Sequence, residues 1–208
     1  MTDVNSFIGE EDVWATIDPD DMWIMDKLIL SKKMGYNCGP VGTPVPERGW
    51  YIVRPCVNAL GLGLGTEKVF IEDSTDWLPT GHFWCEIFEG RHLSIDYHYG
   101  LPDLVVEGFR SPTSYTKWDK WVKVDDTPFH FPDILDSIIE KPWVNCEFIG
   151  NKLIEVHFRR NADFQWDNKE FIPVWDEPNL GDHLERQYAG YRYVEYPEIH
   201  GRIGAFIK

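Results

Sequence analysis

Alternating apolar and polar residues predict two short β-strands at Trp143–Ile149 and Leu153–Phe158. The residues between them, Gly150–Lys152, are of the kinds that form tight hairpin turns. Side chains alternate between the two faces of a strand, so Glu155 and His157 share one face, together with Arg159 just beyond. The pattern therefore predicts a hairpin with polar chemistry on one side.

The register of this hairpin decides which residues meet. If the turn is a three-residue loop, Ile149 pairs with Leu153 and Glu147 lies directly opposite Glu155. A two-residue loop would put the two carboxylates on opposite faces. The chemistry of the site depends on that difference.

Two carboxylates side by side repel each other unless a cation lies between them. Hard oxygen ligands of this kind suit Mg²⁺ or Mn²⁺ that carries nucleotide phosphates. Arg159 could then bind a phosphate through its forked guanidinium group. The alternative is an antiparallel hairpin whose polar face is turned to solvent.

The rest of the chain predicts short helices and strands. Apolar residues at helical spacing favour helices at Asp21–Met34 and Phe131–Lys141. Residues rich in β-branched and aromatic side chains favour strands at Trp50–Arg54, Lys68–Ile71, Phe83–Phe88, His92–Tyr97 and Phe171–Trp175, the last on a sheet edge because of Pro173. Residues 100–115 predict loop and a short strand, Thr116–Val124 a strand or short helix, Gly181–Tyr188 a short helix, and Arg192–Lys208 a terminal strand pair.

The composition indicates a folded chain. Its 208 residues are 43% hydrophobic, which excludes general disorder. The formal net charge of −15 argues against a surface for duplex nucleic acid, because phosphate binding needs clustered Lys and Arg. The acidic N-terminus lacks a signal pattern and no apolar run is long enough to span a membrane. We therefore expect a soluble, cytoplasmic, acidic protein with no membrane or nucleic-acid partner.

Two further features bear on the chemistry. The four cysteines, Cys38, Cys56, Cys85 and Cys146, have neither CxxC nor zinc spacing, so we expect reduced, mostly buried thiols. A glycine-rich stretch, Gly61–Gly65, could approach phosphates closely and offer backbone N–H groups. It has neither the Walker pattern nor the Rossmann fingerprint, and a flexible hairpin tip is the alternative interpretation.

Taken in order, several segments resemble the ATP-grasp superfamily between about residues 26 and 163. A helix opens with Asp26-Lys27-Leu28, and the strand Tyr51–Pro55 ends in Arg-Pro where the family usually has Lys-Pro. The glycine-rich loop follows, and Trp84–Gly90 then resembles the family's adenine and ribose segment. Last comes Glu155–Arg159, similar to the metal-binding Glu-x-Asn-x-Arg of the family.

The resemblance implies an α+β, ATP-grasp-like fold in which two antiparallel-sheet subdomains with flanking helices enclose a nucleotide cleft. Residues 1–20 would be an N-terminal extension and 21–95 a smaller, nucleotide-covering subdomain. Residues 96–208 would be a larger subdomain with the metal-binding hairpin 143–160 and a C-terminal extension. Because the resemblance begins at the family's linker helix, we expect a short form without the usual N-terminal domain. Substrate recognition would then fall to the C-terminal part, to a neighbour in a homo-oligomer or to a separate partner protein.

The resemblance also implies roles for individual residues. Arg54 would contact the α- and β-phosphates and Arg159 would stabilise the γ-phosphoryl group, both as catalytic residues. ATP would be bound by Lys27, Arg54, Gly61, Gly63, Gly65, Glu86, Phe88, Glu89 and His92. The metal, Mg²⁺ or else Mn²⁺, would be held by Glu147, Glu155 and His157.

Two positions depart from the family pattern. His157 stands in place of the usual asparagine, and imidazole is a poor Mg²⁺ ligand, so either Mn²⁺ is tolerated or His157 is not a ligand. His92 stands where a ribose-binding glutamate is often found, which leaves the affinity for the nucleotide and its identity open.

The reaction implied by the family begins with phosphorylation of a carboxylate to an acyl phosphate, which an amine or another nucleophile then attacks. We accordingly expect an ATP- and Mg²⁺-dependent ligase that joins a small-molecule carboxylate to an amine. Two alternatives stay open. One is a degenerate fold that binds a nucleotide or a protein partner without turnover, as an acidic inhibitor or decoy, and the other is a small kinase.

Overall fold

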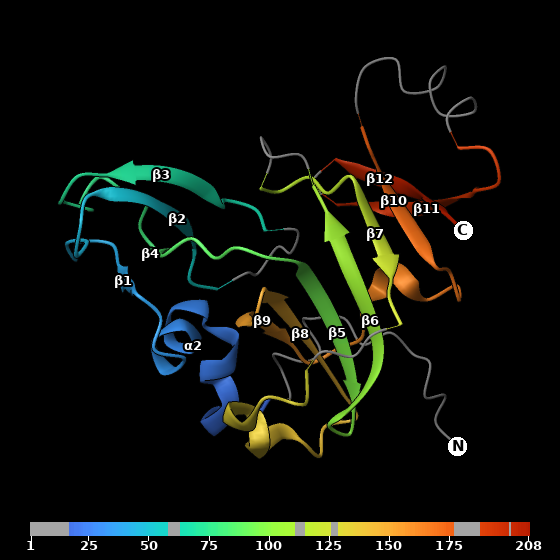
Figure 1. Cartoon of the computed structure of the whole chain (residues 1–208), viewed down its shortest axis with the longest axis horizontal. Coiled ribbons are helices and arrows are strands. Elements are labelled where there is room, and N and C mark those ends of the chain that lie inside the picture. The colour runs from blue at the N-terminus through green and yellow to red at the C-terminus, as the bar shows by residue number, and fades with distance from the viewer. Residues whose placement is uncertain (1–16, 58–62, 111–114, 126–128, 177–187, 200) are drawn as a thin grey trace.

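The protein is described here by a computed structural model. The described residues are 17–57, 63–110, 115–125, 129–176, 188–199 and 201–208. They form two antiparallel sheets, with α2 packed below the smaller sheet and beside the larger one (Figure 1). The expectation of two antiparallel-sheet units is confirmed.

The smaller sheet has four strands. Their spatial order is β1 (Cys38–Pro40), β4 (His82–Cys85), β2 (Gly49–Pro55) and β3 (Glu67–Ile71). One face of this sheet is packed on its own core, which contains Tyr51, Val53 and Trp84. The opposite face carries Arg54, since Arg54 pairs with Phe83 and alternates with the two core residues of β2.

The larger sheet has eight strands. Their order is β11 (Arg192–Ile199), β12 (Arg202–Ile207), β10 (Glu170–Trp175), β7 (Lys120–Lys123), β6 (Leu101–Phe109), β5 (His92–His98), β8 (Trp143–Ile149) and β9 (Lys152–His157). The hairpin expected from the alternation of residues 143–158 is thus β8 and β9, at one edge of the sheet. The terminal strand pair is also confirmed, as β11 and β12.

Alternation divides the β5–β8–β9 part of this sheet into two different faces. Apolar residues on one face pack against the helical segments and form the largest core cluster, which includes Leu93, Ile95, Cys146, Leu153 and Val156. Burying such side chains contributes roughly 1.5–3 kcal/mol each and therefore fixes the face that each strand presents. The intervening polar residues are held on the opposite face.

The helices are shorter than predicted. The segment 21–34 is divided into a 3₁₀ helix, η1 (Pro19–Met25), and the α-helix α2 (Lys27–Lys33), because Asp26 has extended backbone angles and caps α2. The expected helix at 131–141 is a 3₁₀ helix, η2 (Asp133–Ile138). A further 3₁₀ turn is η3 (Ala162–Phe164). None of the helices in the described ranges has the length and apolar character needed to cross a membrane.

Three strand predictions need correction. The nine-residue β6 was expected only as loop and a short strand, and β1 was not predicted. The strand containing Pro173 is not at the sheet edge, because β10 lies between β12 and β7. Proline is tolerated there because β7 is short and pairs only with Glu170 and Phe171, so no described strand pairs with β10 on that side at Pro173.

The strands on either side of Glu89 and Gly90 belong to different sheets. β4 lies in the smaller sheet and β5 in the larger one, so residues 86–91 connect the two. The boundary expected at residue 95 therefore falls inside β5. Residues 1–16 of the expected N-terminal extension and residues 181–187 of the expected short helix lie outside the described residues.

Candidate functional site between the two sheets

The hairpin that carries the acidic pair has a two-residue turn, Gly150 and Asn151, in which Ile149 pairs with Lys152 and not with Leu153. Glu147 nevertheless lies opposite Glu155. A β-bulge restores that pairing, because β9 contains one extra residue, Ile154, between the two ladder pairs. Of the two registers that the sequence left open, the structure has the two-residue turn, and the expectation that this turn separates the two carboxylates was wrong.

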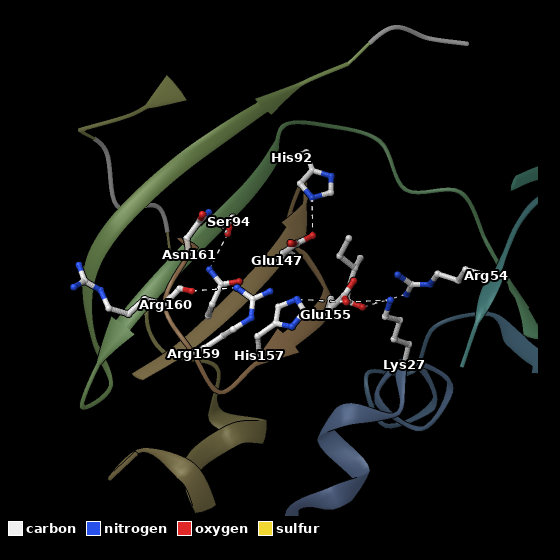
Figure 2. Close-up of polar contacts among 12 residues, drawn as sticks. Lys27, Arg54, His92, Ser94, Glu147, Glu155, His157, Arg159, Arg160 and Asn161 are labelled. Carbon is white, nitrogen blue, oxygen red and sulfur yellow. Dashed lines mark hydrogen bonds and ion pairs between the residues drawn. The ribbon is translucent and has the colours of Figure 1, made fainter. Parts of the chain in front are cut away.

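The carboxylate of Glu155 lies between the side chains of Lys27 and His157. Its Oε1 atom lies 3.0 Å from Lys27 Nζ and 3.4 Å from His157 Nε2. The side chains of Lys27 and Glu155 are only 5% and 11% exposed. Lys27 reaches this position from the first residue of α2 (Figure 2). The pair is therefore a buried ion pair.

Burial is the largest single influence on the pKa of both groups, but it sets the direction of the shift only for Lys27. Burial by itself would raise the pKa of Glu155, but Lys27, His157 and Arg54 together lower that pKa to about 2. Burial lowers the pKa of Lys27, with a smaller contribution from Arg54, although Glu155 acts in the opposite direction. The carboxylate is thus firmly ionised, and the 3.0 Å distance is that of a charged hydrogen bond.

Arg54 approaches the same region from the smaller sheet (Figure 2). It is 7% exposed, and its Nη2 atom donates to the backbone carbonyl of Ile154 at 3.2 Å. Ile154 is the bulged residue, so the bulge supplies the acceptor that ties the two sheets together. The Nε atom of Arg54 is buried and has no hydrogen-bond partner among the residues that the structure describes.

Glu147 is paired with a residue of β5. Its Oε2 atom lies 3.1 Å from His92 Nε2, and the His92 ring is packed edge-on against Trp118 and Trp121. The other ring nitrogen of His92 is buried and finds no hydrogen-bond partner in the described part of the chain. His92 and Glu147, which the sequence assigned to nucleotide and metal, are thus in direct contact.

The connection between the sheets packs closely on the hairpin turn. A Cβ atom on Gly150 would meet the carbonyl oxygen of Glu89 at 2.6 Å, and one on Gly90 would meet the backbone of Gly150 at 2.7 Å. Only glycine permits this approach. Glu86 accepts a hydrogen bond from Asn37 N at 2.8 Å.

The other residues that were expected to bind ATP or its phosphates lie less close to the Lys27–Glu155 pair. Phe88 contacts the ring of Tyr36. Gly63 and Gly65 lie in a turn that leads into β3, whereas Gly61 is outside the described residues. Arg159 follows β9 and points toward the polar face, while Arg160 points away from it (Figure 2).

Sequence reasoning missed a second polar group on the same face. Asn145 Nδ2 donates to Ser94 Oγ at 2.7 Å and to Asp96 Oδ1 at 2.8 Å, and Asn161 N donates to both oxygens of Asp96 at 3.0 Å. Burial raises the pKa of Asp96 to about 6, against the effect of these hydrogen bonds. The alternation of Ser94 and Asp96 with apolar neighbours in the predicted strand was the signal that could have identified them.

The charged side chains at this site are of the kinds that bind phosphate groups and the metal ion that accompanies them. Lys27 and Arg54 are buried cations from opposite sides of the site, and the Nε atom of Arg54 is a donor for which the described ranges hold no acceptor. Glu147 and Glu155 supply the hard oxygen atoms that Mg²⁺ prefers. Within the described ranges, however, no three acidic, histidine or cysteine groups are arranged to hold a metal ion. The set Glu147, Glu155 and His157 is therefore not assembled in this conformation, in which Lys27 holds Glu155.

The sequence matches no protein-family model and no curated protein. Solved structures are similar to it. N5-carboxyaminoimidazole synthase from Aspergillus clavatus, in complex with ADP and 5-aminoimidazole ribonucleotide, aligns with a TM-score of 0.50 and 9% identity, over 95% of this chain and 72% of the synthase.

Two other solved structures align at lower scores. An L-amino acid ligase from Bacillus licheniformis has a TM-score of 0.47 and 11% identity, over 95% of this chain and 71% of the ligase. A protein attributed to the ATP-grasp superfamily from Archaeoglobus fulgidus has a TM-score of 0.46 and 15% identity, over 89% of this chain. The present chain spans 64% of the length of that archaeal protein.

Proposed function

Because this chain has an ATP-grasp fold, we propose that it is an ATP-dependent ligase that joins a small-molecule carboxylate to an amine or similar nucleophile through an acyl phosphate. The main support for the proposal is that charged residues from distant segments of the chain lie close together between the two sheets. Lys27, Arg54 and the hairpin residues Glu147 and Glu155 are separated in sequence and gathered in space. If these four charged residues served only to stabilise the fold, they would not need to lie together at one point.

The proposed roles follow from charge and position. Lys27 and Arg54 would bind phosphate oxygens and hold the nucleotide in line with the acceptor carboxylate. Arg159 would approach the transferred phosphoryl group from the polar face. Mg²⁺ would neutralise phosphate charge when bound, and Glu147 and Glu155 would hold it once Lys27 has turned from Glu155 to the nucleotide.

The nucleotide site can be tested by calorimetric titration of ATP with Mg²⁺ or Mn²⁺. Arg54→Gln should weaken binding by about tenfold to a hundredfold, since a hydrogen bond to a charged group contributes about 1.5–3 kcal/mol. Lys68→Gln is the matched control, because Lys68 is an exposed cation on the neighbouring strand β3. Absence of binding by the wild type with either metal would refute the nucleotide-dependent function.

A nucleotide-binding module without turnover is the second candidate. The Lys27–Glu155 ion pair favours it, because the ammonium group takes the carboxylate that the metal needs. Products distinguish the candidates. A ligase releases ADP and phosphate only when both acceptors are present, a kinase needs one acceptor, and a binding module releases neither.

A further inference from the structure

Cys38 and Cys85 lie directly opposite each other on β1 and β4 of the smaller sheet. In the neighbouring position of the same ladder, Glu86 N donates to Asn37 O at 2.9 Å. Hydrogen-bonded and non-hydrogen-bonded pairs alternate in antiparallel sheets, so the two cysteines form a non-hydrogen-bonded pair. The Cα atoms of such pairs lie about 4.5 Å apart, which is within the range that a disulfide spans.

The two thiols act on each other's pKa and differ in their ionisation. The hydrogen bond from Cys85 lowers the pKa of Cys38, and Lys32 and Arg54 also lower it, against the effect of burial. The same hydrogen bond and burial raise the pKa of Cys85. Cys38 is half-buried, whereas Cys85 is only 2% exposed. Cys38 is therefore the thiol that ionises first and that a small oxidant can reach.

We propose that Cys38 and Cys85 are a reversible dithiol–disulfide pair that hydroperoxides oxidise and small dithiols reduce. The Cys38 thiolate attacks the O–O bond of hydrogen peroxide, so that an S–O bond forms and hydroxide leaves. The Cys85 sulfur then attacks the sulfenic acid sulfur, the S–O bond breaks, and hydroxide leaves with the Cys85 proton as water. In sum, two thiols and one hydrogen peroxide give one disulfide and two water molecules.

The position of this pair gives the oxidation a structural effect. Cys85 is the last residue of β4, where the chain leaves the smaller sheet for the connection to β5. Glu86, the next residue, is held by Asn37 through its backbone and its carboxylate. A disulfide would covalently join the edge strand β1 to the sheet at the start of that connection. This effect does not depend on the proposed ligase activity.

The other two cysteines provide the comparison. Cys146 is fully buried in the core of the larger sheet, where a peroxide has no access. Cys56 is half-buried like Cys38, but burial raises its pKa and it has no cysteine opposite it on a described strand. Cys56→Ser is therefore the matched control variant.

The test is treatment of the reduced full chain with equimolar hydrogen peroxide, followed by blocking of free thiols and peptide mapping without reductant. The wild type and Cys56→Ser should each lose two titratable thiols, yield a cross-linked Cys38–Cys85 peptide, and recover both thiols with dithiothreitol. Cys38→Ser should lose none. An unchanged thiol count, a cross-link to Cys56, or sulfinic acid at Cys38 without a cross-link would overturn the proposal. The peptide map of the wild-type protein tests the proposal by itself, even if a variant does not fold.

Discussion

Replacement of Lys27 by methionine should leave the buried Glu155 carboxylate without its nearest cation. The lysine and glutamate side chains are 5% and 11% exposed and their charged atoms lie 3.0 Å apart. Removal of one partner from a buried ion pair costs about 3–5 kcal/mol, because the other charge stays buried. Arg54 and His157 still stabilise the carboxylate, so we expect the lower end, about 3 kcal/mol. Typical domains have a total stability of about 5–15 kcal/mol, so the loss should be easily measured.

Urea unfolding followed by tryptophan fluorescence measures the free energy directly. Lys32→Met is the control, because Lys32 is an exposed residue of the same helix and its replacement should cost less than about 1 kcal/mol. The double variant Lys27→Met with Glu155→Gln removes both charges and should be more stable than Lys27→Met alone. The reasoning is refuted if Lys27→Met unfolds within about 1 kcal/mol of the wild type, or if the two single losses simply add.

The same pair gives a pH dependence of known sign. The folded-state pKa of Glu155, about 2, lies below the ordinary value of 4.5. The pair therefore contributes its full stability above pH 4.5 and loses it as the pH falls toward 2. The difference in stability between the wild type and Lys27→Met should shrink across that window.

Two other substitutions test separate parts of the fold. The folded-state pKa of Asp96 is raised from 3.8 to about 6, so wild-type stability should fall by about 3 kcal/mol as the pH rises through that window. Asp96→Asn should lack this fall, and parallel pH profiles of urea unfolding for the two proteins would contradict it. Gly150→Ala should cost more than Gly35→Ala, since both glycines have positive φ but only Gly150 would clash, with the Glu89 carbonyl. Equal unfolding midpoints for the two variants would rule out the close approach.

Much of the site could be predicted from alternation along single strands. Where one face of a strand is packed in the core, as in β8 and β9, the polar residues share the other face, and alternation placed Glu155 and His157 together on it. Whether Glu147 joined them was left to the register of the turn. The sequence left the turn open between two and three residues and did not predict the bulge, because the extra residue Ile154 leaves no distinctive local signal. The bulge compensated for the shorter turn.

What the sequence could not give is contact between distant segments. Nothing near Lys27 indicates that its ammonium group reaches a carboxylate on β9, since this depends on how α2 packs beside the sheet. The membership of β5 in the larger sheet likewise depends on pairing with β6 and β8, which local patterns do not specify. The ion pair and the change of sheet at residues 86–91 are therefore findings of the structure.

The bulge at Ile154 makes the tether between the sheets separable from the hairpin that carries it. Without Ile154, the pairs Phe148 with Leu153 and Glu147 with Glu155 would follow one another in a regular ladder. A deletion of this one residue would thus keep both carboxylates in register and take away the buried Ile154 side chain together with the carbonyl that Arg54 holds. The contact that Arg54 makes between the two sheets could then be removed while Glu147 stays opposite Glu155, so this contact and the pairing of the two carboxylates could be varied one at a time.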